Sequence, residues 1–180
     1  KRLNDNGIKV VYQMGDEEFH LYEDMFRIYT REQGVTGKNF LAREEKLEMM
    51  EISMEVSSEF PFSNNNWPSD ITFSLNGVEL GTWTSPGDFA DIRGKYTPDW
   101  YPDNLNQYGL LKTIRIMDHG TYMEGVPLSD ITIKDIPAYE DTWHLKVEVK
   151  EDAEHVGGCT LFGKGFGNYD QDIKLKMFYS

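Results

Sequence analysis

Residues 71–83 read ITFSLNGVELGTW, and this stretch indicates the class of fold more clearly than any other. Apolar and polar side chains alternate in residues 71–75 and again in residues 78–83, which is the period-two pattern of half-buried β-strands. Asn76 and Gly77 lie between the two runs, and this dipeptide is the strongest short signal for a hairpin turn. The stretch therefore predicts an antiparallel β-hairpin.

The same alternation recurs along the chain. The predicted strands are residues 50–56, 71–75, 78–83, 110–116, 131–133, 143–149, 160–162 and 173–177, with further candidates at 8–14 and 25–30. Residues 42–49 (AREEKLEM) have too few apolar positions for a helical stripe and favour a turn or one helical turn. Parallel crossovers would need helices between the strands, and the pattern offers none. The sequence therefore predicts an all-β fold, an antiparallel β-sandwich or jelly roll with long aromatic-rich loops.

Length and charge limit the function. A chain of 180 residues is long enough for one domain with a real core, here placed at residues 46–180, with residues 1–45 as N-terminal strands or an extension. The single cysteine, Cys159, excludes an intramolecular disulfide framework. A net charge of −13 should repel nucleic-acid phosphates and anionic membranes, and no apolar run approaches a membrane span of about 20 residues.

One glycine-rich segment comes within a residue of a phosphate-binding loop. Residues 158–165 read GCTLFGKG, but Gly165 stands where the magnesium-binding hydroxyl residue belongs. Residues 160–162 favour a strand, and no helix is predicted to follow and face a phosphate. These glycines are typical of bulges or tight turns at a strand end.

Other catalytic and metal patterns are also weak. The four histidines, His20, His119, His144 and His155, have none of the spacings of a metal site. A glycosidase-like carboxylate pair needs a spatial separation that the sequence does not supply. The oxygens of Asp99, Asp103, Asn104 and Asn106 suit Ca²⁺, but the calcium-loop register is missing. We predict no catalytic residue, no metal and no cofactor, which leaves binding.

Residues 81–109 are the candidate binding segment. This long connection between predicted strands mixes aromatic side chains with many that form hydrogen bonds, and loops of such length are usually functional or disordered. Its aromatic content argues against disorder. Aromatic faces beside polar groups suit a polar, ring-shaped ligand, although Trp83 and Trp100 have the alternative of closing the core. Residues 163–172 (GKGFGNYDQD) have a similar composition and would complete the site if they lie at the same edge.

A family resemblance covers roughly residues 46–179. It rests on NWPSDITF at 66–73, NGVELGTWTSPGDF at 76–89, PDWYP at 98–102, NQYGLLK at 106–112, VGG at 156–158 and FGKGFGNY at 162–169. Together these resemble the C-terminal domain of predicted ArsR-type winged-helix transcription regulators, mainly from Firmicutes. The resemblance implies a cytoplasmic ligand-sensing or dimerising β-domain, a possible homodimer, that contacts DNA only through a separate winged-helix domain.

Our leading hypothesis is a non-catalytic effector domain of a bacterial transcription regulator that binds a small polar ligand such as a sugar. The predicted ligand-binding residues are Trp83, Asp88, Arg93, Asp99, Trp100, Asn104, Gln107, Tyr108, Asn168 and Tyr169. In this hypothesis the two tryptophans stack on the sugar, the residues between 88 and 107 form hydrogen bonds with it, and Asn168 and Tyr169 close the far side. The alternatives are a carbohydrate-binding module of a larger extracellular enzyme, a purely structural dimerisation domain and a carboxylate glycosidase.

Overall fold

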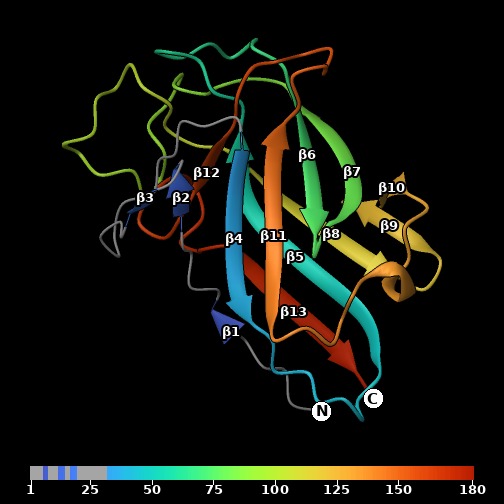
Figure 1. Ribbon diagram of the computed structural model, residues 1–180. Coiled ribbons are helices and arrows are strands. Elements are labelled where there is room, and N and C mark those ends of the chain that lie inside the picture. Colours follow the sequence, from blue (N-terminus) through green and yellow to red (C-terminus); the bar gives the residue numbers. More distant parts are fainter. Residues whose placement is uncertain (1–5, 8–11, 15–16, 20–31) are drawn as a thin grey trace.

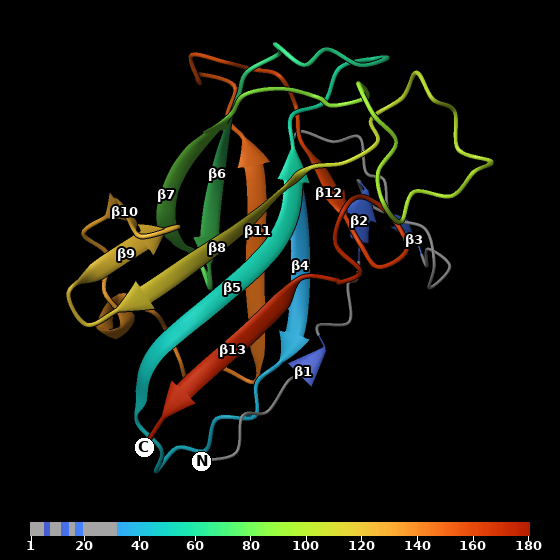
Figure 2. The ribbon, with the colours of Figure 1, turned by 180° about the vertical axis from the view of Figure 1, so that it is seen from behind.

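The structure is a computed structural model that describes residues 6–7, 12–14, 17–19 and 32–180. Two antiparallel sheets pack face to face, which confirms the predicted all-β sandwich (Figure 1). The strands are β1 (Asn6–Gly7), β2 (Tyr12–Met14), β3 (Glu17–Phe19), β4 (Glu32–Lys38), β5 (Leu47–Ser57), β6 (Ser69–Leu75), β7 (Val78–Ser85), β8 (Leu110–Met117), β9 (Gly120–Met123), β10 (Val126–Ser129), β11 (Thr142–Val149), β12 (Thr160–Phe162) and β13 (Lys174–Tyr179). The strands of the two layers cross obliquely, as the views from the front and from behind agree (Figures 1 and 2).

The larger sheet is built around β5. Its strand order is β1-β13-β5-β8-β9-β10, and the short β12 also pairs with β5. One face of β5 supplies Met50, Ile52, Met54 and Val56 to the core, as the alternation predicts, and all four are almost completely buried. Because β5 is longer than its neighbours, its last residues reach into the loops at one end of the sandwich.

The smaller sheet contains the predicted hairpin. Its order is β4-β11-β6-β7, and β6 and β7 are joined by Asn76 and Gly77 with φ angles of 46° and 80°. Two positive φ values in succession are typical of the turn that matches the twist of a hairpin. The Asn76 side chain also donates to the Pro137 carbonyl and accepts from the His144 backbone N–H, which fixes the turn to the neighbouring strand.

The main core lies between the two sheets. Ile71, Phe73 and Leu75 of β6 and Leu145 and Val147 of β11 face the apolar side of β5 and are almost fully buried. This core is contiguous, so the sandwich is stabilised chiefly by burial of apolar surface. Cys159 lies within it, and burial raises the pKa of its thiol to about 12, which makes the thiol unreactive.

Most predicted strands are confirmed, and the differences have local causes. The strand predicted at residues 131–133 does not form. Residues 133–135 form a 3₁₀ turn, η1 (Ile133–Asp135), because the Asp135 carboxylate accepts from the N–H and hydroxyl of Thr132. The β9–β10 hairpin was not predicted; its turn uses Glu124 and Gly125 at positive φ. Strand β4 pairs with β11, so the sandwich begins before residue 46. The candidate strand at 25–30, and residues 8–11 of the one at 8–14, lie outside the described residues.

Candidate functional site

Two long loops lie side by side at one end of the sandwich. Because β7 runs on to Ser85, the first loop spans residues 86–109; the second spans residues 163–173, between β12 and β13. The backbone N–H of Tyr96 donates to the Gly167 carbonyl at 2.8 Å, and that of Lys95 donates to Asn168 Oδ1 at 3.0 Å. Gly167 N–H in turn donates to Thr97 Oγ1 at 3.1 Å. The two segments that the sequence suggested as walls of one site are therefore hydrogen-bonded neighbours.

Glu55 of β5 fastens both loops to the sheet. Its carboxylate accepts from the backbone N–H of Gly109 at 2.9 Å, of Asn168 at 2.8 Å and of Tyr169 at 2.9 Å. The residue is completely buried. Burial raises the pKa of Glu55, although the three N–H donors act to lower it. With these three backbone donors and complete burial, the Glu55 carboxylate links both loops to the sheet and does not reach the surface.

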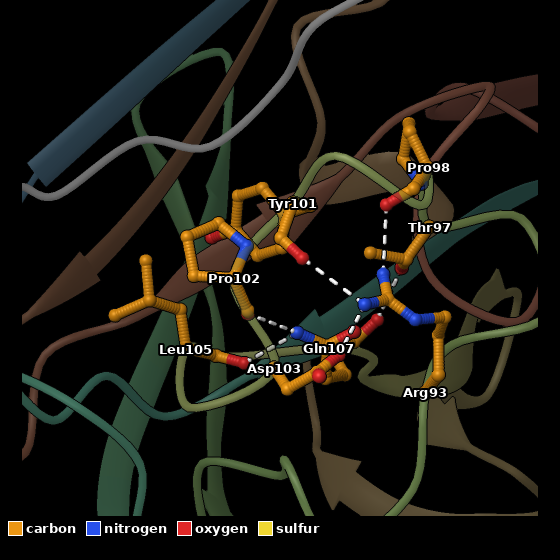
Figure 3. Close-up of polar contacts among 8 residues, drawn as sticks. All are labelled: Arg93, Thr97, Pro98, Tyr101, Pro102, Asp103, Leu105 and Gln107. Carbon is orange, nitrogen blue, oxygen red and sulfur yellow. Dashed lines mark hydrogen bonds and ion pairs between the residues drawn. The ribbon is translucent and has the colours of Figure 1, made fainter.

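The Arg93 side chain binds three other residues of the first loop (Figure 3). Its guanidinium donates to the carbonyls of Pro98 at 2.7 Å and Tyr101 at 3.1 Å, and it also binds the carboxylate of Asp103. The planar fork of arginine suits several acceptors at once. Its donors are thus used inside the loop, although the sequence analysis assigned Arg93 to the ligand.

Gln107 has the same internal role (Figure 3). Its side-chain amide donates to the carbonyls of Pro102 at 2.7 Å and Leu105 at 2.8 Å, and its backbone carbonyl accepts from Thr97 Oγ1 at 2.6 Å. The residue is 1% exposed, so it does not reach a ligand at the surface. Residues 94–107 therefore form a compact loop held by its own polar groups.

A second, smaller core supports this loop. Tyr101, Phe162 and Phe166 are buried together, with Leu105 packed against them. The ring of Trp100 lies edge-on to those of Tyr101 and Phe166, at centroid distances of 5.9 and 6.0 Å, yet the residue is 62% exposed. Edge-to-face aromatic contacts of this kind are favourable. Trp100 therefore contacts both buried rings while most of its surface faces solvent.

Three further predicted residues are engaged elsewhere. Asp88 is buried and accepts from Phe60 N–H at 2.7 Å. Tyr108 stacks on Phe89 and donates its hydroxyl to Asp91 at 2.8 Å; burial, and then that hydrogen bond, raise its pKa to about 12. Trp83 is half-buried against the main core, the alternative that the sequence analysis left open for it. The Lys112 ammonium lies 4.7 Å from the centre of its ring.

Four predicted residues remain exposed at this end: Asp99, Trp100, Asn104 and Tyr169. Tyr96 is also partly exposed, and it lies in the segment that is hydrogen-bonded to residues 167–168. These five exposed residues of the two hydrogen-bonded loops, Tyr96, Asp99, Trp100, Asn104 and Tyr169, are together called the Trp100 surface below. It combines aromatic faces with polar side chains on backbone that the contacts described above hold in place.

The weaker motifs have structural roles. Residues 158–165 contain strand β12. Gly158, just before this strand, has a φ of 71°, a conformation that favours glycine. His155 and His119 lie beside single carboxylates, those of Asp70 and Asp118 respectively. Within the described residues, no group of three histidine, cysteine, aspartate or glutamate side chains could hold a metal ion.

Sequence reasoning missed Glu55. The alternation of β5 places Glu55 with Glu51 and Ser53 on the face away from the core, which suggests a solvent-exposed side chain. The two loops cover the end of that face and bury Glu55 completely. No local pattern marks such a residue, because its burial depends on segments about 54 and 113 positions away.

Comparison with known proteins does not assign a family. No protein-family model matches the chain, and no curated protein matches it significantly. In the described part of the chain, no helix has the length and apolar character needed to cross a membrane.

Proposed function

We propose that this β-sandwich is a non-catalytic binding domain whose Trp100 surface takes a small polar ligand, a sugar. The single observation that carries the proposal is the 62% exposure of Trp100 on a loop that is otherwise closed by its own hydrogen bonds. Large apolar side chains that are exposed in neighbouring loops, as Trp100 and Tyr169 are, often mark an interaction site. Sugar rings stack on such aromatic faces through their C–H groups.

The surroundings of Trp100 support a polar partner over a purely apolar one. Asp99 and Asn104 are exposed in the same loop as Trp100, and Tyr169 is 41% exposed in the neighbouring loop. These side chains offer hydrogen-bond donors and acceptors to hydroxyl groups. Because Glu55 and Arg93 fix the backbone beneath them, a ligand would lose little free energy to ordering the site.

The second part of the proposal is that the domain acts as the effector domain of a cytoplasmic bacterial transcription regulator. It rests on the resemblance to ArsR-type regulators and fits the net charge of −13, because the DNA-reading surface would then belong to a separate winged-helix domain. Ligand binding regulates only if the ligand has different affinities for the DNA-bound and free states. The same surface would serve equally in a carbohydrate-binding module of an extracellular enzyme.

A glycan array followed by calorimetry tests the binding function. We expect at least one neutral sugar to bind the wild type, and Trp100→Ala to weaken it about tenfold or more, while Trp100→Phe retains most of the affinity. Trp67→Ala is the matched control, because Trp67 is also exposed, at 37%, but lies in residues 58–68 and contacts Phe60. The proposal fails if no sugar binds, or if Trp100→Ala binds as well as the wild type.

A dimerisation surface is the second candidate, and one observation favours it. Most of the exposed large apolar side chains lie in loops near this end: Phe62, Trp67, Ile92, Tyr96, Trp100, Val156 and Tyr169. Exposed apolar surface gathered in one region often marks a protein interface. Light scattering over a concentration series separates the two functions, because a dimer that Trp100→Ala dissociates would assign this surface to self-association.

A further inference from the structure

A cavity of about 430 Å³ lies at the end of the sandwich away from the two loops. It is bounded by the start of β5, the end of β8 and the 3₁₀ turn η1, which lie together in both ribbon views (Figures 1 and 2). Its volume falls in the range of small-molecule sites, about 300–1,000 Å³. The cavity shares no residue with the Trp100 surface, so it is a second, separate candidate site.

The floor of the cavity is apolar. Leu47 and Ile133 are buried, and Met49 and Met117 are half-buried. Met49 and Met117 come from the neighbouring strands β5 and β8. Methionine side chains are flexible and adapt to apolar groups of different shapes. The floor therefore suits a compact apolar group without selecting one shape strictly.

The rim carries balanced charge on two sides. Lys46 and Glu48 lie at the start of β5, while Asp118 and Lys134 come from the β8–β9 turn and η1 on the other side. In the described ranges, neither Lys46 nor Lys134 forms a direct ion pair, although the charge of Lys134 contributes to lowering the pKa of Asp118 and of Asp135. The ring Nδ1 of His119 lies 2.5 Å from Oδ1 of Asp118. This contact lowers the pKa of Asp118 and keeps its carboxylate ionised. Each side of the rim thus presents one ammonium and one carboxylate.

We propose that this cavity binds a small zwitterion with an apolar side chain, namely a free apolar α-amino acid. A simple anion would meet the carboxylates of Glu48 and Asp118, and a simple cation would meet the ammonium groups of Lys46 and Lys134. A zwitterion places its carboxylate near a lysine and its ammonium near an acid, which is favourable at both ends. Its side chain then lies on the floor formed by Leu47, Met49, Met117 and Ile133.

Three matched probes test this proposal by NMR, with the methyl signals of Met49 and Met117 as reporters. Phenylalanine carries both charges, 3-phenylpropionate lacks the ammonium and phenethylamine lacks the carboxylate. We expect phenylalanine to shift both methyl signals and to bind about tenfold more tightly than either single-charge analogue. The proposal is overturned if phenylalanine leaves both signals unchanged, or if either analogue binds as tightly.

Charge variants provide the second arm. Lys46→Ala and Lys134→Ala remove exposed side chains, so the fold is retained, and the double variant should bind phenylalanine at least about tenfold more weakly. Lys164→Ala is the control, because Lys164 is exposed in the second loop at the other end of the sandwich. Undiminished binding by the double variant, or an equal loss in Lys164→Ala, would also overturn the proposal.

Discussion

The carboxyl group of Glu55 lies directly against Gly167. A Cβ atom added to Gly167 would stand 2.6 Å from the Glu55 carboxyl carbon, and Gly167 has a φ of 72°. Only glycine fits both conditions, because it lacks the Cβ and adopts positive φ without strain. This contact lets the carboxylate reach the N–H groups of Asn168 and Tyr169, and so fixes the second loop beside the first.

Gly167→Ala should therefore destabilise the domain more than an alanine at an uncrowded glycine. Gly125 is the matched control, with a φ of 82° and no atom within 4 Å of the position that a Cβ would take. Gly125→Ala should cost about 1–2 kcal/mol from its backbone conformation alone. Gly167→Ala should cost about 2 kcal/mol more, from the added overpacking. Urea unfolding measures both, and equal losses would show that the contact with Glu55 is not tight.

Glu55→Ala should lower the free energy of unfolding by about 3 kcal/mol or more. The substitution leaves the buried N–H groups of Gly109, Asn168 and Tyr169 without an acceptor. Amide hydrogen exchange should become faster at those three positions first. Glu79→Ala is the control, since its ion pair with Lys150 is exposed to solvent and contributes little to stability. Unchanged exchange at the three amides would show that Glu55 does not hold the two loops to the sheet.

Arg93→Lys should loosen the first loop without unfolding the sandwich. Lysine keeps the charge but cannot bind the carbonyls of Pro98 and Tyr101 together with Asp103 in one plane. We expect a loss of about 1–2 kcal/mol and faster hydrogen exchange within residues 94–107. Lys95→Ala, on an exposed side chain in the same loop, should change stability by no more than about 0.5 kcal/mol.

Tyr108 should ionise late in an alkaline titration. Burial and the hydrogen bond to Asp91 raise its pKa from 10.0 to about 12. Because the folded pKa lies above the unfolded one, this group's contribution to stability is complete below pH 10 and is lost as the pH rises towards 12. The phenolate absorbance that is missing in Tyr108→Phe reports the ionisation. In Asp91→Asn it should appear at lower pH, whereas an unchanged profile would contradict the assigned hydrogen bond.

The sandwich could be predicted from local pattern because its core follows the alternation of single strands. Trp143, Leu145 and Val147 are buried and His144 is exposed, as period two requires, and Asn76-Gly77 forms the expected turn. The 3₁₀ turn at Ile133–Asp135 was missed because a side-chain cap outweighs strand propensity over three residues.

The candidate site could be located but not resolved into roles. The composition of residues 81–109 indicated an ordered loop rich in aromatic and polar side chains. An arginine or a glutamine, however, can bind either a ligand or its own loop, so the residue types of Arg93 and Gln107 do not reveal their roles. Their carbonyl partners are backbone atoms, which no sequence pattern displays. Trp83 and Trp100 likewise differ only in what packs on them: the main core in one case and two buried aromatic rings in the other.

The central claim is that the exposed ring of Trp100 binds a sugar. The indole N–H signals of the chain's four tryptophans test this claim most directly by NMR. The best sugar from the array is titrated into the labelled wild-type protein. We predict that the Trp100 indole signal moves in a saturable way, while that of Trp143, which is 3% exposed in the main core, stays unchanged. Saturable binding that leaves the Trp100 signal in place would contradict the account.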